Sequence, residues 1–433
     1  MKSRIMAAIA VLIAIYGIMM VGFSSSLATT NNKTGTQQTQ QEPKTLRMMY
    51  WDRSVAELFQ EFADGDESLQ LEFTYVPIYE YASSLSSAIA AGEPLPDICV
   101  LHGEFVSDFL PLSIWEDLSA EPYGLTAERF PSWSQDRIFD GEGKLCAVPC
   151  DIPAAGVAYR AGTMEDVFGY RDRAAVEKAF PTWQALIEKT AQAKASGKDV
   201  YLFASLDDPA TILFNQTDRP YLEDGKLTSE KTIRRMLDIL CSLRDLELTD
   251  QISQCSPNWY DAFTDERYLM AMWSGWLLQN GSFDQDPRQD WQVIPAPDGN
   301  YGYGASVCVI PKSSQRKQEA FDFVKYWLLS SEGADIQKNS VHIFLTSLLK
   351  DERPGARSLC LGSYQGQDIG QTVFQELLPG MRMRPAEPHA AAIQKAFFNT
   401  VSALSYDSSI DADAGWELFC EELRGLVHGV IIP

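Results

Sequence analysis

The sequence is short of basic residues. Its 433 residues include 36 lysines and arginines against 59 aspartates and glutamates, which gives a net charge of −23 at pH 7. A surface of that sign repels phosphate backbones and anionic lipid headgroups. We therefore expect no nucleic-acid partner.

Catalytic and metal-binding patterns are also missing. The four histidines stand far apart, and no tight cluster of cysteine and histidine offers ligands for zinc. The chain contains no G-x-S-x-G, H-E-x-x-H or P-loop pattern. The number of aspartates and glutamates alone does not exclude the pair of catalytic carboxylates that a glycosidase needs. We nevertheless expect a protein that is not an enzyme and that needs no cofactor and no metal.

One long apolar run, residues 5–23, follows a short basic start. Ser26 and Ala28 are small residues at the spacing that signal peptidases read, so cleavage after Ala28 is predicted. Because the run approaches the length that spans a bilayer, an uncleaved anchor is the alternative. Residues 1–28 are thus a signal peptide or an N-terminal anchor, the only predicted membrane contact. Either way the protein is exported, and is extracellular or cell-surface associated, or periplasmic if the source has an outer membrane.

The segment that follows the apolar run is polar. Residues 29–45 have no hydrophobic residue to bury and are predicted to form a disordered spacer. The first cysteine is Cys99, too far along the chain to carry an N-terminal lipid. Eight cysteines in an exported chain permit disulfides, but their number fixes no pairing.

Extended and helical patterns alternate in the next part of the chain. Strands are predicted at residues 46–52, 69–77 and 96–104, with helices at 54–63 and 79–92, the second closed by Gly92. This rhythm is typical of a parallel sheet covered by helices. Ligands bind at the carboxyl ends of strands in such sheets, which here are residues 51–53 and 102–104.

The chain is too long for one ordinary domain, so two lobes are expected. Residues 143–160 hold two apolar runs joined through Pro149 and Pro153, which suit a crossing between lobes better than the middle of a sheet. Beyond it we predict a helix that begins at the N-cap Thr182 and further elements at residues 231–248 (helix), 291–314 (two strands) and 316–337 (one long helix).

Five segments in a fixed order are more specific than any one of them. They are "AIAAGEPLPDI", "GKLCAVPCDIPAAGVAYR", "FPTWQALIEKTAQ", "AFTDERYLMAMWSGW" and "YGYGASVCVIPKSSQRKQEAFDFVKYWLLSSEG". In this order the chain, over roughly residues 46–350, resembles the extracellular solute-binding proteins of ABC importers, in the carbohydrate-binding group that includes maltose-binding protein.

The resemblance implies an α/β fold of the type II periplasmic-binding-protein kind. Each of two lobes would be a mainly parallel sheet flanked by helices, and a hinge would join them. The N-terminal lobe would comprise residues 46–150 plus about 298–350, and the C-terminal lobe residues 151–297 plus about 351–433. A monomer would bind a sugar or oligosaccharide between the lobes and deliver it to an ABC permease. A tethered sensor acting with a membrane receptor, or a binder of a non-sugar solute, is the alternative.

A sugar ring has an apolar face and a rim of hydroxyls, so its site needs aromatic platforms and polar partners. The candidates stand at predicted strand ends, before a helix, beside the crossing, in a glycine-rich loop and after Gly275. They are Trp51, Asp52, Glu104, Tyr79, Tyr81, Asp151, Tyr301, Tyr303 and Trp276. Trp276 is the preferred platform, because Trp273 three residues earlier is expected to end a strand inside the second lobe.

Four further residues are given no ligand role. Trp183 is expected to pack the second lobe. Arg382 and Arg384 have the spacing of one face of an extended segment, and a solvated surface pair is the favoured interpretation. Arg160 departs from the residues common at this point in the family, and the sequence assigns it no role.

Overall fold

The computed structural model describes residues 44–63, 68–279, 281–339 and 353–432. The predicted signal peptide or anchor, residues 1–28, lies outside the described residues, as does most of the predicted spacer. The first strand begins at Lys44, so the last two residues of that spacer belong to the folded part.

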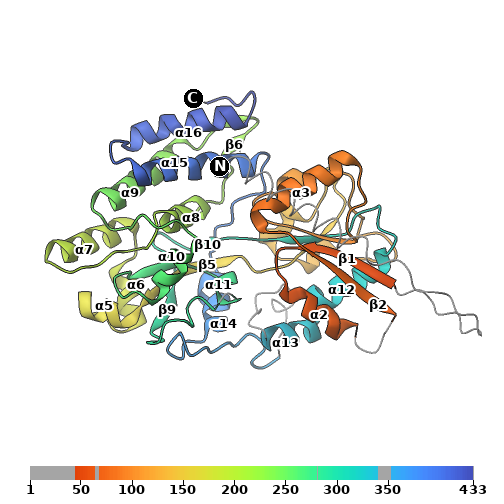
Figure 1. Ribbon diagram of the computed structural model, residues 1–433, viewed down its shortest axis with the longest axis horizontal. Coiled ribbons are helices and arrows are strands. Elements are labelled where there is room, and N and C mark those ends of the chain that lie inside the picture. The colour runs from red at the N-terminus through yellow and green to blue at the C-terminus, as the bar shows by residue number, and fades with distance from the viewer. Residues whose placement is uncertain (1–43, 64–67, 280, 340–352, 433) are drawn as a thin grey trace, which may run out of the picture. The chain divides into compact units, whose positions relative to one another are not determined.

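A five-stranded sheet forms the first lobe (Figure 1). Its order is β2-β1-β3-β11-β4, made of β1 (Lys44–Tyr50), β2 (Leu69–Tyr75), β3 (Ile98–Leu101), β4 (Ala147–Pro149) and β11 (Val307–Val309). β1 runs parallel to β2 and β3, as the alternation of strands and helices predicts. β11, which follows β10 of the second sheet in the sequence, is antiparallel to β3 and β4.

The helices of the first lobe follow the apolar periodicity of the sequence. They include α2 (Ser54–Phe62), α3 (Ile78–Ala91), α4 (Val106–Phe109), the 3₁₀ helix η2 (Ser132–Arg137) and α12 (Lys317–Leu329). In α2 the buried side chains Val55, Leu58 and Phe59 lie on one face. Gly92 ends α3 with φ of +67°, a left-handed conformation that glycine adopts without strain, so the predicted closing glycine is confirmed.

The second sheet is antiparallel. β5 (Ala154–Arg160) pairs in this way with β8 (Met270–Ser274), β9 (Trp291–Ile294) and β10 (Tyr301–Gly302). The expectation of a mainly parallel sheet is therefore wrong for this lobe. Parallel pairing nearby is limited to single bridges such as Tyr201 with Tyr268. β5, which follows the crossing, is antiparallel to each of these three neighbours. The sequence of an apolar strand does not show whether the strand pairs in a parallel or an antiparallel way.

Helices surround this second sheet (Figure 1). The Thr182 side chain accepts a hydrogen bond from the Ala185 N–H, so the predicted N-cap is confirmed. The long helix predicted at 316–337 is broken at Ser330, whose backbone is extended, into α12 and α13. α13 (Ser331–Asn339) packs with α12 and α2 of the first lobe. The helices of the second lobe include α5 (Ala161–Phe168), α6 (Arg173–Ala179), α7 (Trp183–Ala195), α8 (Asp207–Asn215), α9 (Glu230–Asp245), α10 (Pro257–Asp261), α11 (Trp276–Gln279), α14 (Ile369–Thr372), α15 (Ala390–Tyr406) and α16 (Ala412–Leu426).

Two neighbouring segments of the described chain pass directly from one sheet to the other. The chain leaves β4 at Pro149 and enters β5 at Ala154, and it returns between β10 and β11. β4 is an edge strand, where a proline without an N–H is tolerated, so the predicted crossing is confirmed. A Cβ on Gly103 would lie only 1.7 Å from the Gly304 carbonyl oxygen, so glycine permits the end of β3 to touch the returning crossing.

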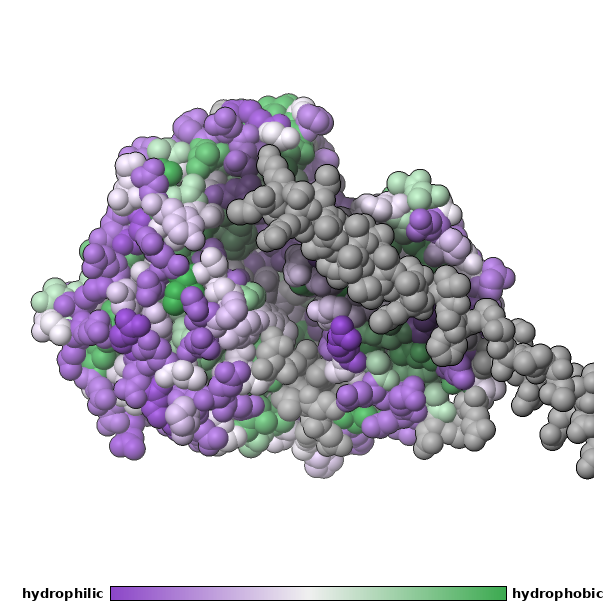
Figure 2. Space-filling view, in the orientation of Figure 1, coloured by the Kyte–Doolittle hydropathy of each residue, from purple (hydrophilic) through white to green (hydrophobic). Residues whose placement is uncertain are grey.

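Buried apolar side chains gather in separate clusters around the two sheets. The proposed lobe boundary near residue 350 falls outside the described residues and stays a prediction. On the face seen in Figure 2, hydrophilic residues dominate and apolar residues are scattered among them. Among the helices that the structure describes, none has both the length and the apolar character needed to cross a membrane.

Candidate functional site

Trp51 and Asp52 lie at the carboxyl end of β1, as predicted. Trp51 is half-buried, with its ring centroid 5.0 Å from that of Tyr81 and 5.7 Å from that of His102. The Asp52 carboxylate accepts hydrogen bonds from the Ser54 N–H at 2.9 Å and from the Ser54 hydroxyl at 2.7 Å. Both side chains keep some exposed surface, which a ligand contact requires.

The two tyrosines of α3 differ from one another. Tyr81 has no exposed surface, and its hydroxyl donates to the Met49 carbonyl and accepts from the Val100 N–H. A side chain enclosed in this way is a core residue, so its predicted ligand contact is wrong for this conformation. Tyr79 is 83% exposed on the surface of the helix. Tyrosine suits both core and site, and the sequence does not separate the two roles.

The crossings hold three further candidates. The Asp151 carboxylate, on the first crossing, accepts a hydrogen bond of 3.0 Å from the Ser306 N–H on the second. Burial raises the pKa of Asp151 to about 7, although the Ser306 N–H and the charge of Arg137 lower it. The Tyr303 N–H donates to the Pro153 carbonyl, and its ring is partly exposed. Tyr301 has no exposed surface and its hydroxyl donates to the Gly156 carbonyl, so it too belongs to the core.

Two of the predicted residues, Glu104 and Tyr303, line one small cavity between the lobes. The remaining lining residues are Gly103, Arg137, Asn215, Gly302, Gly304, Met383, Arg384, Pro385 and Gln394. The free space is about 20 Å³, which is room for about one water molecule. A solute can therefore enter only if the lobes move apart.

The segment around Arg384 bonds directly to the first lobe. Arg137, at the end of η2, donates from Nη2 to the Arg384 carbonyl at 2.8 Å, and the Ala386 N–H donates to Asp136 at 2.7 Å. Arg384 is only 6% exposed, whereas Arg382 is exposed. The surface interpretation is thus wrong for Arg384. The spacing of the two arginines suggests a shared face, but the sequence cannot show what packs against it.

The guanidinium of Arg384 is poorly satisfied. Its Nη1 has no hydrogen-bond partner in the described part of the chain, and the closest carboxylate in an ion pair is that of Glu387 at 3.7 Å. The other Glu387 oxygen accepts hydrogen bonds from the N–H groups of Tyr221 and Leu222. Burial lowers the pKa of Arg384.

The two tryptophans of the β8–α11 segment separate as predicted. Trp273 is on β8, has no exposed surface and donates from its indole nitrogen to the Tyr364 hydroxyl at 3.1 Å. Trp276 is the first residue of α11 and is half-buried against the second core. With Trp51, Asp52 and Asp151, it keeps exposed surface but lies outside the lining of the small cavity.

Arg160, to which the sequence assigns no role, is a buried structural residue. Its guanidinium forms an ion pair with Asp286, donates to the Phe263 carbonyl and lies 4.2 Å from the centre of the Trp291 ring. Trp183 is buried in the second lobe, as expected. All eight cysteines, each within the described ranges, are free thiols.

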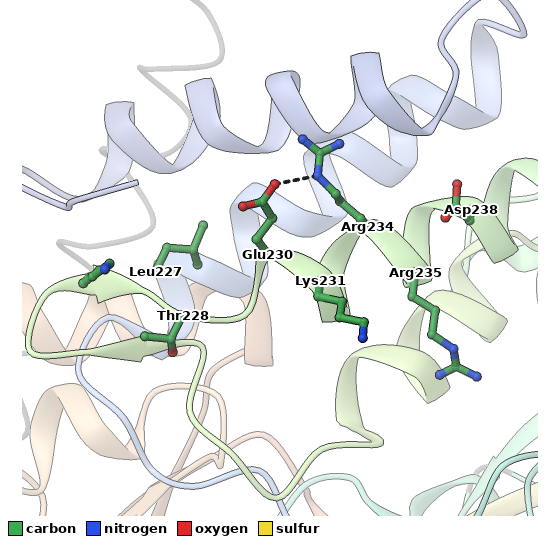
Figure 3. Close-up of a pocket in the computed structure, with 8 residues that line it drawn as sticks. Leu227, Thr228, Glu230, Lys231, Arg234, Arg235 and Asp238 are labelled. Carbon is green, nitrogen blue, oxygen red and sulfur yellow. Dashed lines mark hydrogen bonds and ion pairs between the residues drawn. The ribbon is translucent and has the colours of Figure 1, made fainter. Parts of the chain in front are cut away.

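A larger hollow of about 710 Å³ lies beside α9 (Figure 3). Its lining includes Lys226, Lys231, Arg234 and Arg235. Arg234 pairs with Glu230 and Asp413, and Arg235 pairs with Asp298. The hollow contains no predicted site residue and no aromatic ring, so we do not assign the solute to it.

Comparisons with known proteins agree with this architecture. The family model for bacterial extracellular solute-binding proteins matches residues 56–338. No curated protein sequence matches the chain. A solved extracellular solute-binding protein of family 1 superposes with a TM-score of 0.77 at 17% identity, covering 89% of this chain and 100% of that one.

Two similar structures are described as sugar-binding. The sugar-binding protein MalE from Xanthomonas citri has a TM-score of 0.68 at 19% identity, over 88% of this chain and 97% of that one. The galacto-N-biose/lacto-N-biose I-binding protein of an ABC transporter from Bifidobacterium longum, in complex with lacto-N-biose, has a TM-score of 0.69 at 16% identity, over 91% and 100%. At these identities the structures show a shared two-lobe fold, and the family match shows that the chain belongs to the bacterial extracellular solute-binding proteins.

Proposed function

We propose that the protein captures a sugar or oligosaccharide between its lobes, outside the cytoplasm, and delivers it to an ABC permease. The observation that carries this proposal is the interlobe cavity, where Glu104 and Arg137 of the first lobe face Tyr303, Asn215 and Arg384. Carboxylate, amide and guanidinium groups are suitable hydrogen-bond partners for sugar hydroxyls. Structural neighbours that bind sugars support the choice of ligand class.

Capture requires no covalent chemistry. A solute that contacts both lobes only when they are closed binds the closed state more tightly and shifts the population toward it. The bonds from Arg137 and Asp136 to the 384–386 segment already join the lobes here. In this proposal the protein acts as a monomer and a binder, and we expect no turnover of glycans.

Half-buried aromatic rings supply the apolar platforms in this proposal. Trp276 at the start of α11 and Trp51 at the end of β1 each combine packing on one side with exposed surface. A sugar ring stacks its C–H face on such a ring. Trp276 is the proposed principal platform, and Trp51, Asp52, Asp151, Glu104 and Tyr303 are the proposed further contacts.

Calorimetry with a panel of mono- and oligosaccharides tests the proposal, and at least one saturable ligand is expected. Trp276→Ala should weaken that binding by about 1–3 kcal/mol because a stacking platform is lost, with little change in the urea unfolding curve. Tyr406→Ala, which removes an exposed ring from the end of α15, is the matched control and should leave the affinity unchanged.

Three results would count against the proposal. A null result across the whole panel contradicts sugar capture, and hydrolysis of any glycan contradicts the binding-only role. If Trp276→Ala lowers folding stability and leaves the affinity unchanged, Trp276 is a core residue and not a ligand contact.

A further inference from the structure

Two buried arginines face the interlobe cavity from opposite lobes. Arg137 is 1% exposed and Arg384 is 6% exposed, and both line the cavity. Burial lowers the pKa of Arg384; the charges of Glu387 and Glu104 act against this, and the positive charge of Arg137 adds a smaller lowering. A buried charge is unfavourable unless it is paired and hydrogen-bonded.

Arg137 is well provided with partners. Its Nη2 donates to the Arg384 carbonyl, and its Nε donates to the Asp136 carboxylate at 3.1 Å. Asp136 in turn accepts from the Ala386 N–H. This set of bonds joins the lobes and satisfies the arginine of the first lobe.

Arg384 is not satisfied in the same way. Its Nη2 reaches the Gln394 amide oxygen only at 3.4 Å, its guanidinium lies 4.9 Å from the centre of the Phe214 ring, and its Nη1 has no hydrogen-bond partner within the described ranges. The Oε2 of Glu387 accepts from two backbone N–H groups, and its Oε1 lies 3.7 Å from Nη1, which is an ion pair too long for a hydrogen bond. A buried guanidinium thus presents an unused N–H donor at a cavity.

The chemistry of this donor favours an anionic partner. A guanidinium binds a carboxylate through parallel N–H bonds, and charge-assisted bonds of this kind are stronger than bonds to neutral hydroxyls. A neutral sugar would accept a hydrogen bond but would add no negative charge to the long ion pair between Arg384 and Glu387. Glu104, Asn215 and Gln394 in the same lining are suited to the hydroxyls.

Resting on the proposed function, we propose that the solute is an acidic saccharide whose carboxylate pairs with Arg384. The two guanidiniums and the single Glu104 carboxylate of the lining match a ligand that carries one acid among many hydroxyls. Arg384 is then the residue that separates acidic from neutral sugars.

Calorimetry on the intact protein tests this with three matched probes. They are short oligomers of galacturonic, glucuronic and mannuronic acid, the methyl esters of the same oligomers, and neutral maltotriose. At least one acid should bind on the order of ten- to a hundredfold more tightly than its ester, the scale of one charge-assisted bond. High salt should reduce this difference.

Two variants assign the effect to a residue. Arg384→Gln should abolish the preference for the acid over the ester, whereas Arg382→Gln, two residues away and exposed, should retain it. A urea unfolding curve reports whether Arg384→Gln is folded. If it is not, the acid-to-ester ratio of the unaltered protein decides alone.

The failures are distinguishable. Equal or tighter binding of the esters overturns the acidic-sugar inference, and so does binding of neutral sugars alone, while both leave sugar capture standing. A preference for the acid that persists in folded Arg384→Gln overturns the role of Arg384. Binding of no saccharide at all overturns both proposals.

Discussion

One arginine is buried in the interior of the second lobe and another between the lobes, and the two guanidiniums differ in their partners. Arg160 is paired with Asp286, bonded to a backbone carbonyl and stacked on Trp291. Arg384 is almost as deeply buried. Each arginine keeps one nitrogen without a hydrogen-bond partner in the described structure, Nε in Arg160 and Nη1 in Arg384, but Arg384 has only a long ion pair, 3.7 Å to Glu387, and lines a cavity. A charge that the fold itself satisfies is a structural device. A charge that the fold leaves unsatisfied at a cavity marks a place for a ligand.

The largest expected effect is on the Arg160 side of this comparison. Arg160→Met should destabilise the protein by about 3–5 kcal/mol, because the buried Asp286 would keep only Arg288 as a charged partner and the Phe263 carbonyl would lose its donor. Urea unfolding measures the loss. Arg267→Met, which removes an exposed arginine paired with Asp265, is the control and should change stability by about 1 kcal/mol or less. A similarly small loss for Arg160→Met would remove the basis of the comparison.

A smaller effect is expected at the crossings, between the two regions. The pKa of Asp151 is raised from an ordinary 3.8 to about 7 in the folded protein, so the folded state holds its proton more tightly than the unfolded chain. The contribution of Asp151 to the free energy of unfolding is therefore complete below about pH 4. It falls by at most about 4 kcal/mol as the pH rises toward 7. Asp151→Asn keeps an acceptor for Ser306 and should flatten that dependence in unfolding curves between pH 5 and 8. An unchanged pH dependence would contradict the assignment.

The smallest expected change in stability is at Arg384. Arg384→Gln should lower the free energy of unfolding by about 1–2 kcal/mol, less than Arg160→Met, because the ion pair with Glu387 that it breaks is long, 3.7 Å, and glutamine keeps an N–H donor. The same urea series as for Arg160→Met measures it. A loss of about 3 kcal/mol or more would place both arginines in one structural class.

Much of the fold could be predicted from short-range pattern. The β1–α2–β2–α3–β3 order, the N-cap at Thr182, the crossing after Pro149 and the separation of Trp273 from Trp276 all depend on residues close together in the sequence. The direction of the neighbours of β5 could not be predicted, because it depends on where the chain enters the second sheet.

The site could be predicted less well, for a related reason. Tyr81 and Tyr301 have the composition of sugar contacts, but their hydroxyls find backbone partners inside the lobes. Arg137 was absent from the predicted set, because a buried arginine in "SQDR" has no local sign of the segment that it meets 247 residues later. Long-range contacts decide these roles, and sequence periodicity does not contain them.

The contact between Gly103 and the Gly304 carbonyl offers a means of control. The hydrogen on Gly103 is the only substituent that fits there, because a methyl group would lie 1.7 Å from the oxygen. One added carbon at position 103 would act as a wedge between the end of β3 and the returning crossing, within the lining of the interlobe cavity. The resting aperture of the protein could thus be adjusted at one backbone position without replacing any side chain proposed to contact the solute, as a solute sensor built on this scaffold would need.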